Sequence, residues 1–178
     1  MALTSTIYTF DISLSDVDRN VYEQLALKVA CHPSETDEYL LTRVLAYCLE
    51  YAEGIQFSKG LSDPEDPAIS VRDLTGAIRS WIEIGAPDAA RVHKASKAAP
   101  RVAVYTHKEP RLFMRAYEGA KLHRAESIEF HAMDRELLSA LVRHLDRRVK
   151  LTLSRTDGQL YVDIGGESLT GVVERLTL

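Results

Sequence analysis

The stretch WIEIGAPDAARVHK, residues 81–94, decides the fold class, because it joins a strand to the start of a helix. Trp81, Ile82 and Ile84 are typical of a buried strand, and after Pro87 a helix is predicted over about residues 88–99. Glu83 stands inside this strand. A buried carboxylate is costly unless a partner neutralises it. The stretch therefore raises the question of why an acid is placed there.

The segments on either side extend this pattern into a mixed sheet. Upstream, two strands over about residues 67–72 and 77–84 flank the turn Asp73-Leu74-Thr75-Gly76. Downstream, the apolar run RVAVYTH (101–107) is typical of a buried parallel strand. The order strand, helix, strand predicts a crossover unit.

The remaining elements continue the mixed α/β pattern. Upstream of the crossover unit the sequence predicts a β-hairpin (4–14 and 21–30), a helix over about 35–52 that starts at a capping box of Ser34 and Asp37, and a strand at 55–57. Downstream it predicts a helix (111–120), a strand (127–132), a helix (135–148) ending in the basic run RHLDRRVK (143–150), a hairpin turning on Asp157-Gly158, and a strand (172–177). The fold class is α/β with a mixed β-sheet, an N-terminal β-hairpin and a β-rich C-terminal tail.

Composition limits the function classes. The 178 residues predict a single domain over 1–178, and 46% hydrophobic with 27% charged residues is typical of a globular protein. A net charge of −4 argues mildly against tight nucleic-acid binding. No apolar run is long enough for a membrane span and no signal-peptide layout is visible, so we expect a cytoplasmic protein without membrane contact. Cys31 and Cys48 predict buried thiols rather than a disulfide or zinc site.

Two acids are predicted to meet at one end of the central hairpin. If Asp73 pairs with Gly76, residue numbers across the hairpin sum to 149, and Asp66 stands opposite Glu83. Opposed residues share a face of the sheet, here a polar face away from Ile82 and Ile84. Two carboxylates at that distance repel unless a cation lies between them. Hard oxygen ligands suit Mg²⁺ or Mn²⁺, so Asp66 and Glu83 are the candidate metal ligands.

Cationic side chains on the following helix complete the candidate site. Arg91 and Lys94 are three residues apart and share a helix face, and Lys97 extends their stripe. Lys59, in the loop that leads to Asp66, is a further candidate. Lys94 is the candidate catalytic cation, and Arg91, Lys97 and Lys59 are candidate phosphate-binding residues. The substrate class that these groups fit is a phosphodiester, with nucleic acid as the partner.

Structural interpretations of the same residues remain open. A one-residue slip would turn Asp66 to the other face of the hairpin, and a Lys/Arg stripe is commonly the solvated face of a helix. His32 and Glu50 are weaker candidates: His32 stands beside a proline and the predicted capping serine, and Glu50 would be an extra acid on the first helix.

Five segments resemble the bacterial YaeQ family. They are HPSETDE (32–38), FSKGLS (57–62), DLTG (73–76), WIEIGAPD (81–88) and HKAS (93–96). With the flanking strands, the resemblance covers nearly the whole chain. The family has no established biochemical function, and its fold is regarded as a variant of the PD-(D/E)xK core, the restriction-endonuclease-like fold.

The resemblance implies that Asp66 is the first acid of that motif and Glu83 the second. Gly85 stands two residues after Glu83, where the motif has its lysine. Some members of the wider fold supply this lysine from the following helix, and Lys94 is the candidate here. The resemblance thus implies a metal-dependent nuclease. The alternative is a non-catalytic binding or regulatory module that keeps the fold without the activity.

Overall fold

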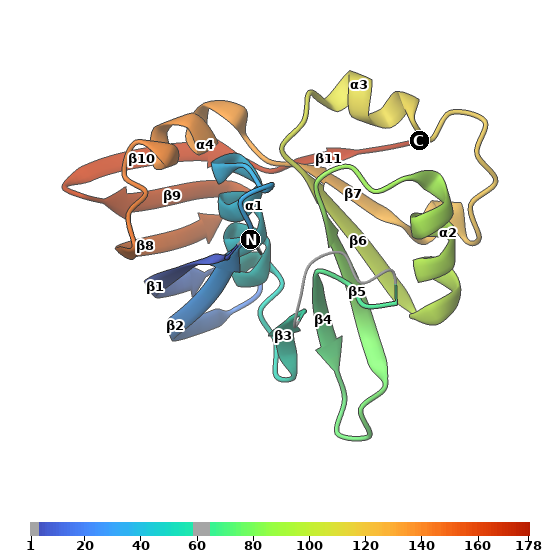
Figure 1. Cartoon of the computed structure of the whole chain (residues 1–178), viewed down its shortest axis with the longest axis horizontal. Coiled ribbons are helices and arrows are strands. Elements are labelled where there is room, and N and C mark those ends of the chain that lie inside the picture. The colour runs from blue at the N-terminus through green and yellow to red at the C-terminus, as the bar shows by residue number, and fades with distance from the viewer. Residues whose placement is uncertain (1–3, 59–64) are drawn as a thin grey trace. The chain divides into compact units, whose positions relative to one another are not determined.

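The computed structural model describes residues 4–58 and 65–178, which fall into two compact units (Figure 1). Unit 1 combines the segment up to Leu41 with Asp134–Val173. Unit 2 combines Thr42–Met133 with Glu174–Leu178. The single-domain interpretation of residues 1–178 stays a prediction.

Unit 1 is built on a five-stranded sheet. Its strands are β1 (Thr6–Asp16), β2 (Val21–Cys31), β8 (Arg148–Thr156), β9 (Gln159–Ile164) and β10 (Glu167–Val172), in the order β10-β9-β8-β1-β2. The predicted N-terminal hairpin is confirmed. It joins the C-terminal strands in one sheet through the parallel pair β1–β8, in which Phe10 lies opposite Val149.

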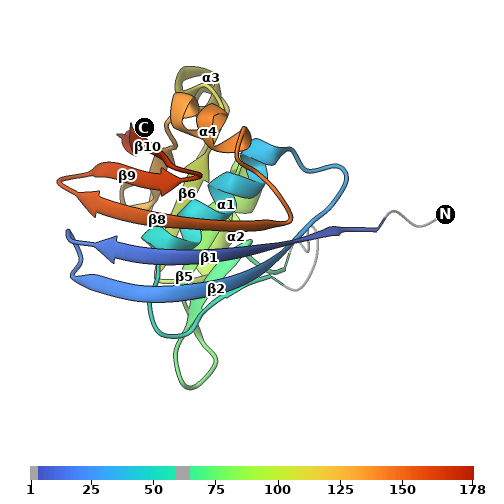
Figure 2. The same ribbon diagram turned by 90° about the vertical axis from the view of Figure 1, so that its left-hand side faces the viewer.

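Strand alternation buries one face of this sheet and leaves the other open. Phe10, Ile12 and Leu14 are buried, whereas Asp11 between them is exposed. Helix α4 (Arg135–Val142) packs on the buried face, where a Cβ atom on Gly171 would come within 2.8 Å of the Leu137 side chain. In Figure 2 the sheet faces the viewer, and α4 is seen along its β10 edge.

The prediction of a helix to residue 148 is wrong. Helix α4 ends at Val142, and β8 already starts at Arg148. From there, buried Val149 and Leu151 alternate with exposed Arg148 and Lys150, which is the two-residue period of a strand. The pairing of β8 with β1 therefore overrides the helical interpretation of this basic run.

Helix α1 (Asp37–Leu49) begins in unit 1, and its residues from Thr42 onward belong to unit 2. The helix is where the sequence predicts it, but the capping residue differs. Thr36 Oγ1 accepts a hydrogen bond from the Tyr39 amide at 3.1 Å, so Thr36 rather than Ser34 caps the helix. Cys31 and Cys48 are both buried and not joined in a disulfide, as predicted.

Unit 2 is built on a six-stranded sheet. Its strands are β3 (Ile55–Phe57), β4 (Ile69–Arg72), β5 (Ile78–Ile84), β6 (Arg101–Thr106), β7 (Glu129–Ala132) and β11 (Glu174–Leu176), in the order β11-β7-β6-β5-β4-β3. Strands β5, β6 and β7 are parallel, connected by α2 (Ala89–Ala98), and by α3 (Pro110–Arg115) with a 3-10 turn at Ala125–Ser127. The predicted crossover unit is confirmed.

The second half of β5, residues 81–84, is buried on both faces, contrary to the expectation of a polar face around Glu83. Ile82 is fully buried on one face. On the other face, Trp81 joins an apolar cluster with Val92 of α2 and with Val104, the neighbour of Glu83 on β6. Central parallel strands are covered on both faces by their crossover helices, which explains the difference.

The register of the β4–β5 hairpin also differs from the prediction. Ile69 pairs with Ile82, so residue numbers across the ladder sum to 151 rather than 149, and Asp66 precedes β4 instead of pairing with Glu83. Two local features cause the shift. The loop has three residues, because the Asp73 amide bonds the Ala77 carbonyl at 3.0 Å and Gly76 takes the positive φ of 86° that such loops need. A bulge between Val71 and Arg72 adds the second shift.

Candidate functional site

Glu83 is a buried carboxylate whose two oxygens both have partners. Its exposed fraction is only 4%. The indole nitrogen of Trp81, two residues earlier on the same face of β5, donates to Oε1 at 2.6 Å. The Arg91 guanidinium lies 2.9 Å from Oε2. Together these donors compensate the burial of the charge.

Arg91 reaches Glu83 from the first turn of α2. The chain leaves β5 through Gly85, whose φ of 91° turns the backbone in a way that side-chain-bearing residues rarely adopt. Asp88 then caps α2 by accepting a hydrogen bond from the Arg91 amide at 2.8 Å. The glycine at the position where the motif would have a lysine is therefore the residue that turns the chain toward α2.

The same guanidinium also contacts Asp66. Arg91 Nη2 donates to the Asp66 backbone carbonyl at 2.9 Å, so one side chain connects the two predicted acidic positions. The Asp66 carboxylate itself points to Arg72, with an oxygen–nitrogen distance of 3.4 Å, and is about one-third exposed. Asp66 and Glu83 are thus neighbours through Arg91, but their carboxylates are not a directly opposed pair.

The other predicted cations are placed as follows. Lys94 forms an ion pair with Glu65, whose side chain is largely exposed. Lys97 is exposed in the last turn of α2. Lys59 lies outside the described residues. The helix face that carries Arg91 and Lys94 therefore faces the segment of Glu65 and Asp66, which brings Arg91 and Lys94 to the predicted acids.

Tyr117 adds an aromatic hydroxyl near the same region. Its hydroxyl donates to the Pro87 carbonyl at 2.5 Å, in the connection between β5 and α2. Burial, and then the carboxylates of Asp88 and Glu83, raise the pKa of Tyr117, so the hydroxyl stays protonated as a donor. Sequence reasoning did not find this residue, because it lies thirty positions from its partner.

A divalent cation fits this site only after a rearrangement. Over residues 4–58 and 65–178, no group of three or more His, Cys, Asp or Glu side chains is arranged to hold a metal ion. Glu83 supplies one hard oxygen ligand, but a guanidinium now holds that oxygen. The Asp66 carboxylate is partly exposed and makes only a long contact to Arg72, so it can turn. The donor chemistry suits Mg²⁺ or Mn²⁺ once Arg91 releases Glu83.

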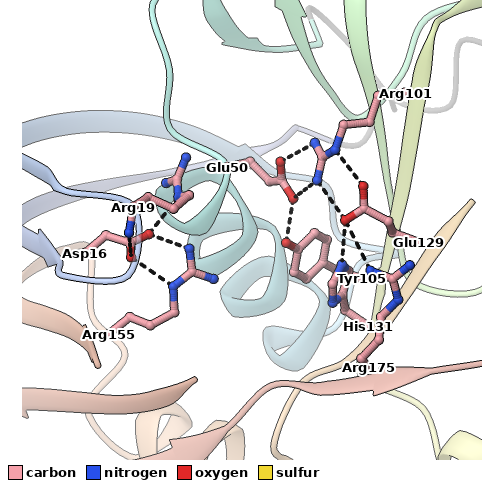
Figure 3. Close-up of polar contacts among 9 residues, drawn as sticks. All are labelled: Asp16, Arg19, Glu50, Arg101, Tyr105, Glu129, His131, Arg155 and Arg175. Carbon is pink, nitrogen blue, oxygen red and sulfur yellow. Dashed lines mark hydrogen bonds and ion pairs between the residues drawn. The ribbon is translucent and has the colours of Figure 1, made fainter. Parts of the chain in front are cut away.

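A second polar network in unit 2 was not predicted as a site (Figure 3). Arg101 donates to Glu50 at 2.6 and 3.0 Å and to Glu129 at the same two distances. The Tyr105 hydroxyl donates to Glu50 at 2.6 Å. Because Val104 is the β6 residue beside Glu83, its neighbour Tyr105 points to the opposite face of the sheet. Glu50 is therefore not an extra acid for the Glu83 site.

The charges around Glu129 have a clear electrostatic effect. His131, 3.4 Å away, and then the Arg101 guanidinium lower the pKa of Glu129 to about 2, against the opposing effect of burial. Arg175 on β11 lies 3.4 Å from the same carboxylate. The network joins the end of α1 to three strands, so its first role is structural.

Unit 1 has its own buried carboxylate, Asp16, which is fully buried. Arg155 donates to it through Nε at 3.0 Å and Nη2 at 2.5 Å, and Arg19 donates through Nε at 2.8 Å (Figure 3). Burial alone would raise the pKa of Asp16, but the hydrogen bonds from Arg155 and Arg19 outweigh it and lower the pKa. These contacts tie the β1–β2 turn to β8.

Comparison with known proteins places the chain among close relatives. A family model described as YaeQ protein matches residues 1–172. An Escherichia coli (strain K12) protein named "Uncharacterized protein YaeQ" is 33% identical over 165 residues, which cover 91% of this chain and 90% of the relative. The Salmonella typhi protein of the same name is 32% identical over 164 residues, with the same coverage.

Two solved structures match nearly the whole chain. The crystal structure of YaeQ protein from Pseudomonas syringae has a TM-score of 0.86 at 30% identity and covers 98% of this chain and 97% of that one. The crystal structure of YaeQ protein from Xanthomonas axonopodis pv. citri has a TM-score of 0.87 at 29% identity, with 98% and 99% covered. Separately, among the described residues no helix has the length and apolar character needed to cross a bilayer.

Proposed function

The chain belongs to the YaeQ family, and we propose that its Glu83 region, in a nuclease-like fold of the PD-(D/E)xK type, hydrolyses phosphodiester bonds of nucleic acid with the help of Mg²⁺ or Mn²⁺. One observation carries the proposal. The Arg91 guanidinium contacts both the Glu83 carboxylate and the Asp66 backbone carbonyl, and Lys94 pairs with Glu65, so the two acidic residues lie beside two cations of α2. This is the set of groups that phosphodiester hydrolysis requires.

Each residue has a defined role in this proposal. Asp66 and Glu83 are the metal ligands, and a bound Mg²⁺ or Mn²⁺ would supply an activated water and stabilise charge on phosphate. Lys94 is the catalytic cation, close enough to the Asp66 segment to pair with Glu65. Lys97 and Lys59 add positive charge for substrate binding.

Arg91 is the residue that must change partners. In the described state it neutralises Glu83, which keeps a buried carboxylate stable. Released from Glu83, the guanidinium can bind a phosphate through two parallel hydrogen bonds. Exchange between a carboxylate and a phosphate would link substrate binding to the opening of the acidic site.

The alternative function is a non-catalytic binding or regulatory module, and one observation favours it. Both oxygens of Glu83 already have donors, Trp81 and Arg91, and Lys94 is paired with Glu65. In that case the Arg91–Glu83 pair is permanent and serves only the stability of unit 2.

Calorimetric titration of Mn²⁺ and Mg²⁺ tests the two functions. We expect wild type to bind metal and the Asp66→Asn/Glu83→Gln double variant to lose binding. Asp73→Asn is the matched control, because Asp73 is an acid at the far end of the same hairpin that holds its own turn. Arg91→Gln should bind metal about tenfold more tightly if the guanidinium competes for Glu83. If neither wild type nor Arg91→Gln binds metal, or if the double variant binds metal as tightly as wild type, the metal-dependent function is wrong and the non-catalytic module remains.

Cleavage assays then test catalysis directly. Wild type is incubated with metal and labelled single-stranded DNA, duplex DNA and RNA. Lys94→Ala should abolish cleavage, whereas Lys121→Ala, an exposed cation outside the site, should leave it unchanged. Cleavage that persists in Lys94→Ala would remove this lysine from the catalytic site, and cleavage that persists in Glu83→Gln would point to a contaminating nuclease.

A further inference from the structure

The outward face of the five-stranded sheet in unit 1 carries ordered rows of side chains. Alternation along each strand sends the apolar residues to the face under α4 and leaves the intervening residues open to solvent. The strand registers place these outward residues in rows across the sheet. The outward residues therefore form one solvent-facing surface of unit 1.

One row has an aromatic ring near each end. Tyr22 on β2 lies opposite Ser15 on β1, Ser15 lies opposite Ser154 on β8, and Ser154 lies opposite Tyr161 on β9. The two tyrosines are among the most exposed large side chains of unit 1, at 56% and 48%. With strands about 4.8 Å apart, three strand spacings separate the rings by roughly 14 Å.

The opposite end of the face carries cations. Lys28 on β2 and Arg148 on β8 both lie opposite Thr9, and Lys150 lies in the adjacent row opposite Asp11. The face also carries two carboxylates, Asp11 and Asp163. Three cations and two carboxylates give these positions a net charge of +1, whereas the whole chain has a net charge of −4. A local excess of positive charge favours contact with a phosphate backbone.

Between the tyrosines and the cations the face is hollowed. The hollow has a volume of about 280 Å³, and its polar lining consists of Asp11, Ser13, Gln24, Lys150, Thr152 and Asp163. The second carboxylate, Asp163, is held by hydroxyl donors, with Ser168 Oγ at 2.6 Å and Thr152 Oγ1 at 3.3 Å. The charge of Asp163 is thus partly satisfied within the protein.

We propose that this open sheet face binds single-stranded nucleic acid, with bases stacked on Tyr22 and Tyr161 and the backbone directed toward Lys28, Arg148 and Lys150. Exposed aromatic rings on an open sheet can stack only unpaired bases, which selects a single strand over a duplex. The roughly 14 Å between the rings is about four times the 3.4 Å spacing along a stacked strand, so they hold bases that are not neighbours. The choice of nucleic acid as the ligand rests on the proposed function. Binding at this face is nevertheless independent of catalysis, because it needs neither a metal nor Glu83.

Fluorescence anisotropy with labelled dT12 in EDTA tests the proposal. EDTA and a Glu83→Gln background prevent hydrolysis, so failure of the proposed function leaves this measurement intact. Tyr22→Leu and Tyr161→Leu should each weaken binding about tenfold, the loss expected for one stacked base. Tyr22→Phe and Tyr161→Phe should retain binding, because the ring rather than the hydroxyl carries the contact. Leu112→Ser, an exposed apolar residue of unit 2, is the matched control and should bind like wild type.

Salt dependence separates the cations from the rings. Arg148→Ala and Lys150→Ala should each lower the slope of log K against log salt by about 0.7, and Lys121→Ala should not. Absence of dT12 binding, or equal binding by wild type and the Tyr→Leu variants, would overturn the proposal. Nuclear magnetic resonance shifts at this face with the neutral sugar maltohexaose, and none with dT12, would also overturn it in favour of a saccharide site.

Discussion

Asp16 and Glu83 are both buried carboxylates held by arginine, yet their surroundings differ in a way that separates structure from proposed function. Asp16 is bound by two guanidiniums, from Arg19 in the β1–β2 turn and Arg155 in β8. Glu83 is bound by one guanidinium and one indole, and that guanidinium also contacts the Asp66 backbone. Arg91 thus connects Glu83 to a second segment, and Arg155 likewise lies 3.8 Å from Asp18 in the β1–β2 turn. The carboxylate held by two guanidiniums is a structural clamp, whereas the one held by a single guanidinium and an indole is the site of the proposed exchange.

The largest effect is expected from removal of the Asp16 carboxylate. Asp16→Ala leaves two arginines without their buried counter-ion, so we expect a loss of about 3–5 kcal/mol in the free energy of unfolding. Urea unfolding followed by circular dichroism measures the loss. Asp11→Ala, an exposed acid on the same strand, should change stability by no more than about 0.5 kcal/mol. Equal effects of the two substitutions would contradict the clamp.

A somewhat smaller effect is expected at Glu83. Arg91→Met leaves the buried carboxylate with Trp81 as its remaining described donor and should lower the free energy of unfolding by about 3 kcal/mol. Unfolding can be monitored by the fluorescence of Trp81, the single tryptophan. The Glu83→Gln/Arg91→Met double variant should recover part of this loss, because no unpaired charge remains. If the two single effects simply add, the pair is not coupled and the contrast with Asp16 disappears.

Glu129 extends the comparison to a partly buried carboxylate with a shifted pKa. The pKa of Glu129 in the folded protein, about 2, is below the ordinary glutamate value. Glu129 therefore stabilises the fold above the unfolded pKa, and this contribution to the free energy of unfolding is lost as pH falls from about 4.5 to 2. The loss over that window is on the order of 2 kcal/mol, because partial solvent contact screens the ion pairs. Unfolding measured between pH 5 and 2 should show a shallower fall for Glu129→Gln; an unchanged pH profile would argue against the shift.

The smallest effect on stability is expected from the Tyr117 hydroxyl, which bonds the connection between β5 and α2. Tyr117→Phe removes the hydrogen bond to the Pro87 carbonyl and should cost about 1 kcal/mol in the unfolding of unit 2. Tyr161→Phe, at an exposed ring of unit 1, is the control and should have no measurable effect on stability. Identical stabilities of Tyr117→Phe and wild type would show that water replaces this bond.

The main elements of the fold were predictable because their signals are local. The alternating runs of β1 and β2, the apolar run of β6 and the Asp157-Gly158 turn each depend on a few neighbouring residues. The failures arose where distant pairing decides. The end of α4 was predicted six residues too late, since β1 recruits Arg148 into a strand from far away in the sequence. The β4–β5 register was two residues off, because neither the three-residue loop nor the bulge between Val71 and Arg72 leaves a clear mark in the sequence.

The candidate site divides in the same way. The sequence predicted that Asp66, Glu83, Arg91 and Lys94 belong to one neighbourhood, since β5 runs directly into α2 and a short hairpin precedes it. It did not predict which atoms meet: the Asp66 carboxylate faces Arg72, and its backbone carbonyl faces Arg91. It also gave no sign of the Glu50–Arg101–Glu129 network, whose members come from three separate elements.

By itself, the sequence determined the class of the elements, the crossover unit and the family, because periodicity, turn residues and short motifs are properties of consecutive residues. Only the tertiary structure decided the state of Glu83. A strand's alternation specifies that Glu83 faces away from Ile82, but not what covers that second face. The packing of α2 over β5 buries the carboxylate with Trp81 and brings Arg91 to it. Burial and ion pairing depend on elements that approach through space, and this is why the purpose of an acid inside a strand could not be read from the strand alone.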